Sequence, residues 1–171
     1  MRPLPLAVLA AFLATPLHAG EEKRELSSHQ HGHVELRVAI DGGTLSMEME
    51  APGENIVGFE HAAKTDEQKK AVADAKAKLA DATALFTLTA DAGCSLTSSE
   101  AEIHQEGEHN AFEASYSFAC DDIAKLSSIE TKLFALFPSI EEIDVDYATA
   151  AGQGSVELEA DKPVITLPAT S

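Results

Sequence analysis

Two alternating segments joined by a glycine turn place the strongest constraint on the fold. Apolar residues occupy every second position over residues 34–40 and again over residues 45–49. Between them stands Asp41-Gly42-Gly43, which is typical of a tight hairpin turn because these residues adopt positive φ readily. The segments are therefore predicted to form an antiparallel hairpin with one buried face and one exposed face.

Two helices are predicted downstream of this hairpin. Residues 65–84 begin with a capping box, Thr65 to Gln68, and carry apolar residues at spacings of three and four. Residues 126–137 repeat this signal, with Ser127 three residues before Glu130, and Pro138 ends the segment. Further strands are predicted at 94–103, 112–120, 143–147, 156–158 and 164–167, the last as an edge strand after Pro163.

This order of elements predicts an α+β fold, with a largely antiparallel sheet and both helices packed on one face. The alternative is a β-sandwich in which the helices are crossovers. Residues 1–19 are interpreted as a secretory signal peptide, residues 20–33 as a mobile leader containing histidines, and residues 34–171 as a single domain. No other stretch has the roughly 20 apolar residues needed for a membrane span, so we expect no membrane insertion.

The chain is strongly acidic, with 29 Asp and Glu residues against 12 Lys and Arg residues and a formal net charge of −17. Nucleic acid and anionic membrane surfaces are therefore poor partners, whereas cations are attracted from a distance. This charge balance is common in exported proteins, so it does not by itself indicate a metal site.

Three histidines, His29, His31 and His33, lie within five residues just before the first predicted strand. If the strand extends through them, alternate side chains point the same way and converge on one ion. Neutral imidazole is a good ligand for zinc, copper or nickel. The alternative interpretation is a solvated polar tail.

A second candidate stretch is the polar loop predicted at residues 104–110. Its donor residues form a flexible set that can surround one metal ion: His104, Glu106, Glu108 and His109. The alternative is an ordinary charged hairpin loop. We expect His104 or His109 to share a zinc ion with the N-terminal histidines, within one subunit or across a homodimer.

The chain has two cysteines, Cys94 and Cys120. In an oxidising compartment an even count favours a disulfide, and Cys120 falls on the apolar phase of its strand. A zinc site formed by the two thiolates is the competing interpretation, although the close Cys-x-x-Cys spacing is absent. We expect a disulfide that joins the start of one central strand to the end of another.

Several short motifs in fixed order resemble the ZrgA-like family of bacterial periplasmic zinc-binding proteins. They are His-Gly-His-Val-Glu-Leu at 31–36, Val-Gly-Phe-Glu-His at 57–61, Gly-Cys at 93–94 with Cys120, Leu-Phe-Ala-Leu-Phe-Pro at 133–138 and Gly-Gln-Gly at 152–154. The resemblance covers essentially the whole chain after the signal peptide. It implies a periplasmic, non-enzymatic protein that takes part in zinc acquisition.

The same resemblance implies ligands among the N-terminal histidines and at His104 and His109. Members of the family often carry a long His/Asp-rich insertion in this loop, whereas this chain has a short loop with Glu106 and Glu108. His61 also matches the family pattern, and both a ligand role and a structural role remain open for it.

The favoured function is therefore a binding protein that buffers Zn²⁺ or delivers it to an uptake component. One rival is a zinc-dependent hydrolase with Glu106 or Glu108 as base, but the chain has no His-Glu-x-x-His motif to fix the geometry. Another is an interaction protein that senses pH through its histidines. Because nitrogen and oxygen donors bind copper more tightly than zinc, the sequence does not select the metal.

Overall fold

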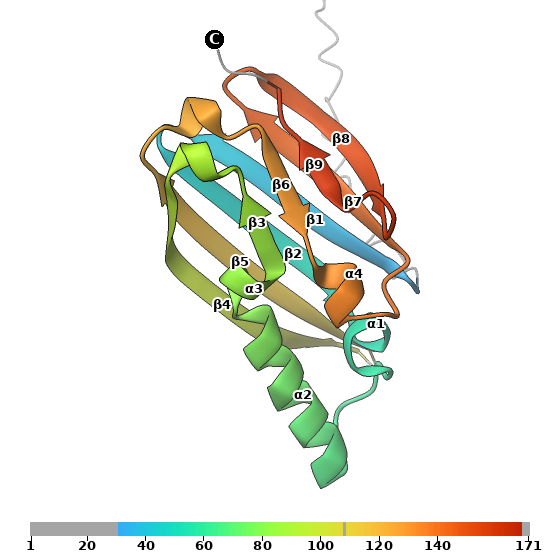
Figure 1. Ribbon diagram of the computed structural model, residues 1–171. Coiled ribbons are helices and arrows are strands. Elements are labelled where there is room, and N and C mark those ends of the chain that lie inside the picture. The colour runs from blue at the N-terminus through green and yellow to red at the C-terminus, as the bar shows by residue number, and fades with distance from the viewer. Residues whose placement is uncertain (1–30, 108, 169–171) are drawn as a thin grey trace, which may run out of the picture.

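Six strands form one large sheet in the order β4-β5-β2-β1-β7-β8 (Figure 1). The computed structural model describes residues 31–107 and 109–168. The strands are β1 (His33–Asp41), β2 (Thr44–Pro52), β4 (Cys94–Glu106), β5 (His109–Cys120), β7 (Glu142–Thr149) and β8 (Gly152–Glu159). All neighbours in this sheet are antiparallel except β1 and β7, which run parallel.

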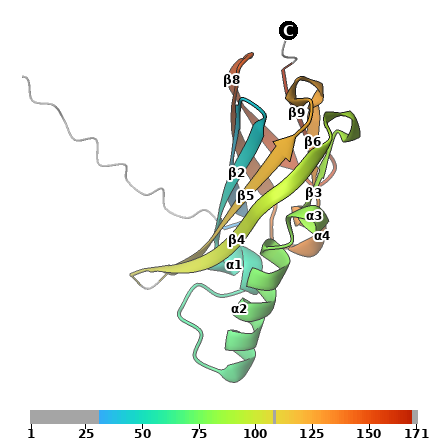
Figure 2. The same ribbon diagram turned by 90° about the vertical axis from the view of Figure 1, so that its left-hand side faces the viewer.

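A second layer covers one face of this sheet (Figures 1 and 2). It contains a three-stranded sheet in the order β3-β6-β9 together with short helices. The strands are β3 (Phe86–Leu88), β6 (Ser128–Thr131) and β9 (Val164–Thr166). The helices are α1 (Gly53–Val57) at the end of β2, α2 (Asp66–Leu79), α3 (Ala82–Leu85) and α4 (Leu133–Leu136), with 3₁₀ turns η1 (Ala90–Ala92) and η2 (Ile123–Lys125).

The core lies between the two layers. Val34, Leu36 and Val38 are buried while the residues between them are exposed, as the alternating pattern predicts. Tyr116 of β5 joins the layers, because its ring packs edge-on against Phe86 and its hydroxyl donates a hydrogen bond to the Leu79 carbonyl at 2.9 Å. The α+β prediction is therefore confirmed, with a small second sheet among the helices. No helix in the described part of the chain is long and apolar enough to cross a membrane.

The hairpin predictions are confirmed, but the predicted loop at 104–110 is wrong. Gly42 and Gly43 form the turn between β1 and β2, and Gly42 has a φ of 57°. In the second hairpin, β4 continues to Glu106 and β5 already begins at His109. The polar residues of this hairpin lie mostly in strands because pairing between the strands satisfies their backbone groups.

The first helix prediction is confirmed in its main part, and the second is wrong. Thr65 forms the predicted capping box with Gln68, but the helix ends at Leu79, and Asp81 caps the separate helix α3. The segment 126–137 instead contains strand β6 and the single turn α4. Strand β6 pairs with both β3 and β9, so backbone pairing outweighs the local helical pattern. Strand β9 lies at an edge, as Pro163 predicts.

Cys94 and Cys120 form the predicted disulfide, at the start of β4 and the end of β5. The two residues face each other in the strand register. The strands are not both central, however, because β4 is an edge strand of the large sheet.

The outer face of the large sheet carries a line of acidic side chains, which we call the carboxylate row. The register places one residue of the row on each strand, in the order Glu157, Asp144, Glu35, Glu50, Glu113 and Glu102. Part of the row lines a hollow of about 340 Å³ that also contains His104. Like charges directly opposite one another destabilise a sheet. Their combined negative potential also attracts cations to this face.

Candidate metal centre

A buried asparagine holds the histidine-bearing segment beside helix α1. Asn55 is 2% exposed; its side-chain oxygen accepts a hydrogen bond from the Gly32 N–H at 2.8 Å, and its amide donates to the His33 carbonyl at 2.7 Å. Gly32 has a φ of 87°, which favours glycine. Because Gly32 is not extended, the rule that alternate side chains converge does not hold here, and His31 and His33 contact different carboxylates.

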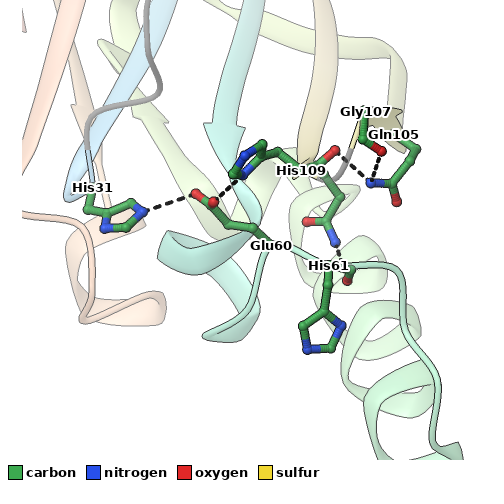
Figure 3. A network of polar contacts seen from close by, with 7 residues as sticks. His31, Glu60, His61, Gln105, Gly107 and His109 are labelled. Carbon is green, nitrogen blue, oxygen red and sulfur yellow. Dashed lines mark hydrogen bonds and ion pairs between the residues drawn. The ribbon is translucent and has the colours of Figure 1, made fainter.

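His31 and His109 lie on the two oxygens of one carboxylate, that of Glu60 (Figure 3). Nε2 of His31 is 3.2 Å from Oε1 of Glu60, and Nδ1 of His109 is 2.5 Å from Oε2. The three residues come from the start of the described chain, the loop between α1 and α2, and the first residue of β5. We call this group the His31–Glu60–His109 cluster.

Glu60 is the fixed member of this cluster. Its side chain is 16% exposed, against 67% for His31 and 60% for His109. Its backbone carbonyl accepts a hydrogen bond from the Asn110 N–H at 2.6 Å, and the Asn110 side chain donates to the His61 carbonyl at 2.9 Å. Two buried asparagines, Asn55 and Asn110, therefore position the segments that carry the cluster.

The carboxyl group of Glu60 is more acidic than an ordinary glutamate. Burial raises its pKa, but the hydrogen bond and charge of His109, together with those of His31, outweigh burial and hold the pKa below its usual value. Glu60 is therefore ionised at neutral pH, which is the form in which a carboxylate binds a metal.

The donor types of this cluster, two imidazoles and one carboxylate, are ligands that a zinc ion takes. A tetrahedral ion with bonds of about 2.0 Å holds its ligand atoms about 3.3 Å apart. His31 and His109 contact opposite oxygens of Glu60, and the ligand atoms of the three residues do not all lie within 4.8 Å of one another. One or both of the exposed imidazoles must therefore turn towards a common centre before one ion binds all three residues. Three protein donors leave one tetrahedral position open for water, another ligand or a receiving protein.

A second mixed group lies on the outer face of the large sheet, where β1 and β7 run side by side. Nδ1 of His33 is 3.5 Å from a carboxylate oxygen of Glu142 and 3.6 Å from one of Asp144. One ligand atom from each residue lies within 4.8 Å of the other two. We call this the His33–Glu142–Asp144 cluster.

The other candidate histidines lie elsewhere. His104 is on the outer face of β4, 3.5 Å from Glu102 and 3.3 Å from Glu113. The ring of His61 stacks on Phe59, with centroids 5.1 Å apart, and Figure 3 shows it directed away from Glu60. These contacts favour the structural role for His61.

The side chains of three predicted ligands are not placed by the structure. His29 and Glu108 lie outside the described residues, as do the predicted signal peptide and the first part of the leader, and Glu106 is described only as the end of β4. Conversely, sequence reasoning missed Glu60, Glu142 and Asp144 as candidates. Glu60 lies inside the motif at 57–61, so a signal for it existed, whereas Glu142 and Asp144 belong to an ordinary alternating strand.

The comparisons with known proteins agree with this donor chemistry. Residues 28–167 match the family described as "ZrgA family zinc uptake protein". A search of the curated proteins finds no match for the chain. Since the matched range includes nearly all of the described residues, the chain belongs to the ZrgA family of zinc uptake proteins.

Proposed function

We propose that this protein binds Zn²⁺ at the His31–Glu60–His109 cluster and acts in the periplasm, buffering zinc or delivering it to an uptake component. The observation that carries the proposal is a single ionised carboxylate flanked by two imidazoles from distant parts of the chain. The family match supports zinc as the metal, because imidazole with carboxylate is also a donor set for copper and nickel.

The exposure of the two imidazoles supports a role in exchange. A structural zinc site is closed by four protein ligands, whereas the residues that the structure describes supply three to this cluster, and both histidines are more than half exposed. A receiving protein can therefore reach the ion and replace the imidazoles one at a time, while the more buried Glu60 retains it. Such a site suits a cargo ion that enters and leaves.

The exposure of the two imidazoles also leads us to propose binding rather than catalysis. Catalysis by a zinc hydrolase needs a bound water and a general base held in fixed geometry. In this cluster the carboxylate lies between the imidazoles and is itself a ligand candidate, and the imidazoles are exposed rather than packed. Zinc binding by imidazole and carboxylate weakens in acid because protons compete for the ligand atoms, which accommodates pH dependence without a separate sensing role.

Zinc titration of the purified protein in competition with a chromophoric chelator tests the proposal. Replacing His31 and His109 together with alanine should lower the affinity of the tightest zinc by at least about 10–100-fold, because even loss of residues that only support a metal ligand costs that much. The matched control replaces His61 and His104 with alanine and should leave that affinity unchanged.

Two outcomes would contradict this assignment. If the His31 and His109 variant binds zinc as tightly as the parent, the tight site lies elsewhere. If the parent protein binds no zinc at micromolar concentrations, zinc binding itself is wrong. Repeating the titration with Cu²⁺ and Ni²⁺ measures selectivity directly.

A further inference from the structure

The His33–Glu142–Asp144 cluster is built by two strands that are remote in sequence and adjacent in space. His33 and Glu142 face each other in the parallel pairing of β1 and β7, and Asp144 is the next residue of β7 on the same face. The side chains of His33 and Glu142 are both 30% exposed, and that of Asp144 is 48% exposed. Strand pairing therefore fixes the backbone positions of all three donors.

In the described part of the chain, no basic residue neutralises the carboxylates of Glu142 and Asp144. Among the described residues, Glu142 and Asp144 form no ion pair with lysine or arginine, and His33 is their partner. The neighbouring Arg37 contacts Glu35 at 2.8 Å instead. Asp144 also stands in the carboxylate row between Glu35 and Glu157, so like charges surround it. A divalent cation here would relieve repulsion that the protein leaves in place.

The spacing of the donors also suits a cation. Distances of 3.5 Å and 3.6 Å from the imidazole nitrogen to the two carboxylates are close to the separation of about 3.3 Å between ligands of a tetrahedral zinc ion. One nitrogen and two carboxylates, which can each supply one or two oxygens, leave open positions for water. Such an oxygen-rich set binds zinc and tolerates harder ions such as Mn²⁺ better than the site with two imidazoles does.

The two clusters are adjacent but separate. Gly32 lies between His31 and His33, and its positive φ allows one imidazole to contact Glu60 while the other contacts β7. The Gly32 carbonyl accepts hydrogen bonds from the N–H groups of Glu141 and Glu142, at 2.8 Å and 3.1 Å, which fixes this branch point against the start of β7. A single ion is thus not shared by His31 and His33 in this arrangement.

We propose that His33, Glu142 and Asp144 form a second divalent-cation site, weaker for zinc than the His31–Glu60–His109 cluster and filled after it. The inference rests on the proposed function for its choice of zinc as cargo. It adds that each chain holds two zinc ions, of which the second is bound mainly by carboxylates and exchanges faster.

Counting the bound ions tests this inference. Native mass spectrometry of the purified protein with excess Zn²⁺ should show two ions per chain. The isosteric variant Glu142→Gln with Asp144→Asn should retain one ion with the tight affinity of the parent, because His31, Glu60 and His109 are untouched. The control variant Asp146→Asn, on the same strand and face and hydrogen-bonded to Ser155, should retain two ions.

The variant His31→Ala with His109→Ala separates the two proposals. It should retain one ion, now at the weaker affinity, and a further Glu142→Gln change should remove it. If Glu142→Gln with Asp144→Asn does not change the number of bound ions, the second site is wrong while the proposed function stands. If the parent binds no zinc, the proposed function is wrong. Circular dichroism of each variant establishes that the fold is retained.

Discussion

At the scale of single residues, Asn110 connects the fold to the metal chemistry. Its side chain is 3% exposed, its N–H binds the Glu60 carbonyl, and its side-chain amide binds the His61 carbonyl. Its side-chain oxygen has no hydrogen-bond partner among the described residues. It lies so close to Gly53 that a Cβ at that glycine would be 1.7 Å from it. The position of Glu60 therefore depends on the absence of a side chain at residue 53.

Replacing Gly53 with alanine should displace Asn110 and disturb Glu60. Overpacking of this kind costs about 1–3 kcal/mol, so urea denaturation should show a lower free energy of unfolding. Zinc affinity should fall as well, because the carboxylate no longer lies between His31 and His109. The control is Gly43→Ala, whose Cβ makes only an ordinary contact of 3.5 Å. A destabilised Gly53 variant with the zinc affinity of the parent would show that Asn110 does not position Glu60.

The sequence identifies the histidines of both clusters more readily than their carboxylates. His31 and His33 are conspicuous because, with His29, they place three histidines within five residues. His109 is conspicuous because it lies in a short polar segment with His104. Glutamate and aspartate are frequent on any acidic surface, so Glu60, Glu142 and Asp144 do not stand out. The left-handed backbone at Gly32, which separates the histidines into two clusters, depends on contacts with Asn55 and with β7.

At the scale of elements, local signals predict hairpins and the long helix well, and mispredict residues 126–137. Ser127 and Glu130 have the spacing of a capping box, yet this segment fills the gap between β3 and β9 as a strand. Its partners β3 and β9 lie far from it in the sequence, so no local pattern reveals the pairing. The predicted strands at 94–103 and 112–120 are shorter than β4 and β5 because the two strands pair with each other through their polar ends. The polar composition of those ends does not reveal that pairing.

The disulfide should stabilise the β4–β5 hairpin without affecting zinc. Cys94 and Cys120 are separated by 26 residues, so loss of this cross-link should lower the free energy of unfolding by about 3 kcal/mol. His109 lies at the opposite end of β5, roughly 35 Å along the strand at about 3.3 Å per residue. The Cys94→Ser, Cys120→Ser variant should thus unfold at lower urea concentration and keep the zinc affinity of the parent. A large loss of affinity would contradict this separation.

At the scale of the whole molecule, the carboxylate row concentrates negative charge on one face of the large sheet. Composition predicts that the protein attracts cations, but it does not predict that six carboxylates align, because the alignment depends on the register of all six strands. Repulsion along the row weakens as salt shortens the Debye length from about 30 Å at 0.01 M to about 8 Å at 0.15 M. Added salt should therefore raise the thermal stability of the metal-free protein.

Neutralising one member of the row should produce part of the same effect. Glu157 faces Asp144 at one end of the row, so Glu157→Gln should raise the free energy of unfolding at low ionic strength by about 0.5 kcal/mol. The gain should shrink at 0.15 M salt. The control is Glu130→Gln, an exposed position on β6 opposite Thr87 and Val164. Equal responses of the two variants to salt would show that the row has no special electrostatic effect.

The parallel pairing of β1 with β7 also has a consequence for the order of events during biosynthesis. Ribosomes deliver the N-terminus first, at about 5–20 residues per second. More than a hundred residues separate His33 from its partner Glu142, so the leading histidines emerge several seconds before β7 exists to receive them. An unfinished chain therefore presents His33 without Glu142 and Asp144. Metal binding by His33, Glu142 and Asp144 is thus a property of the completed chain, because it needs the last third of the chain paired with the first strand.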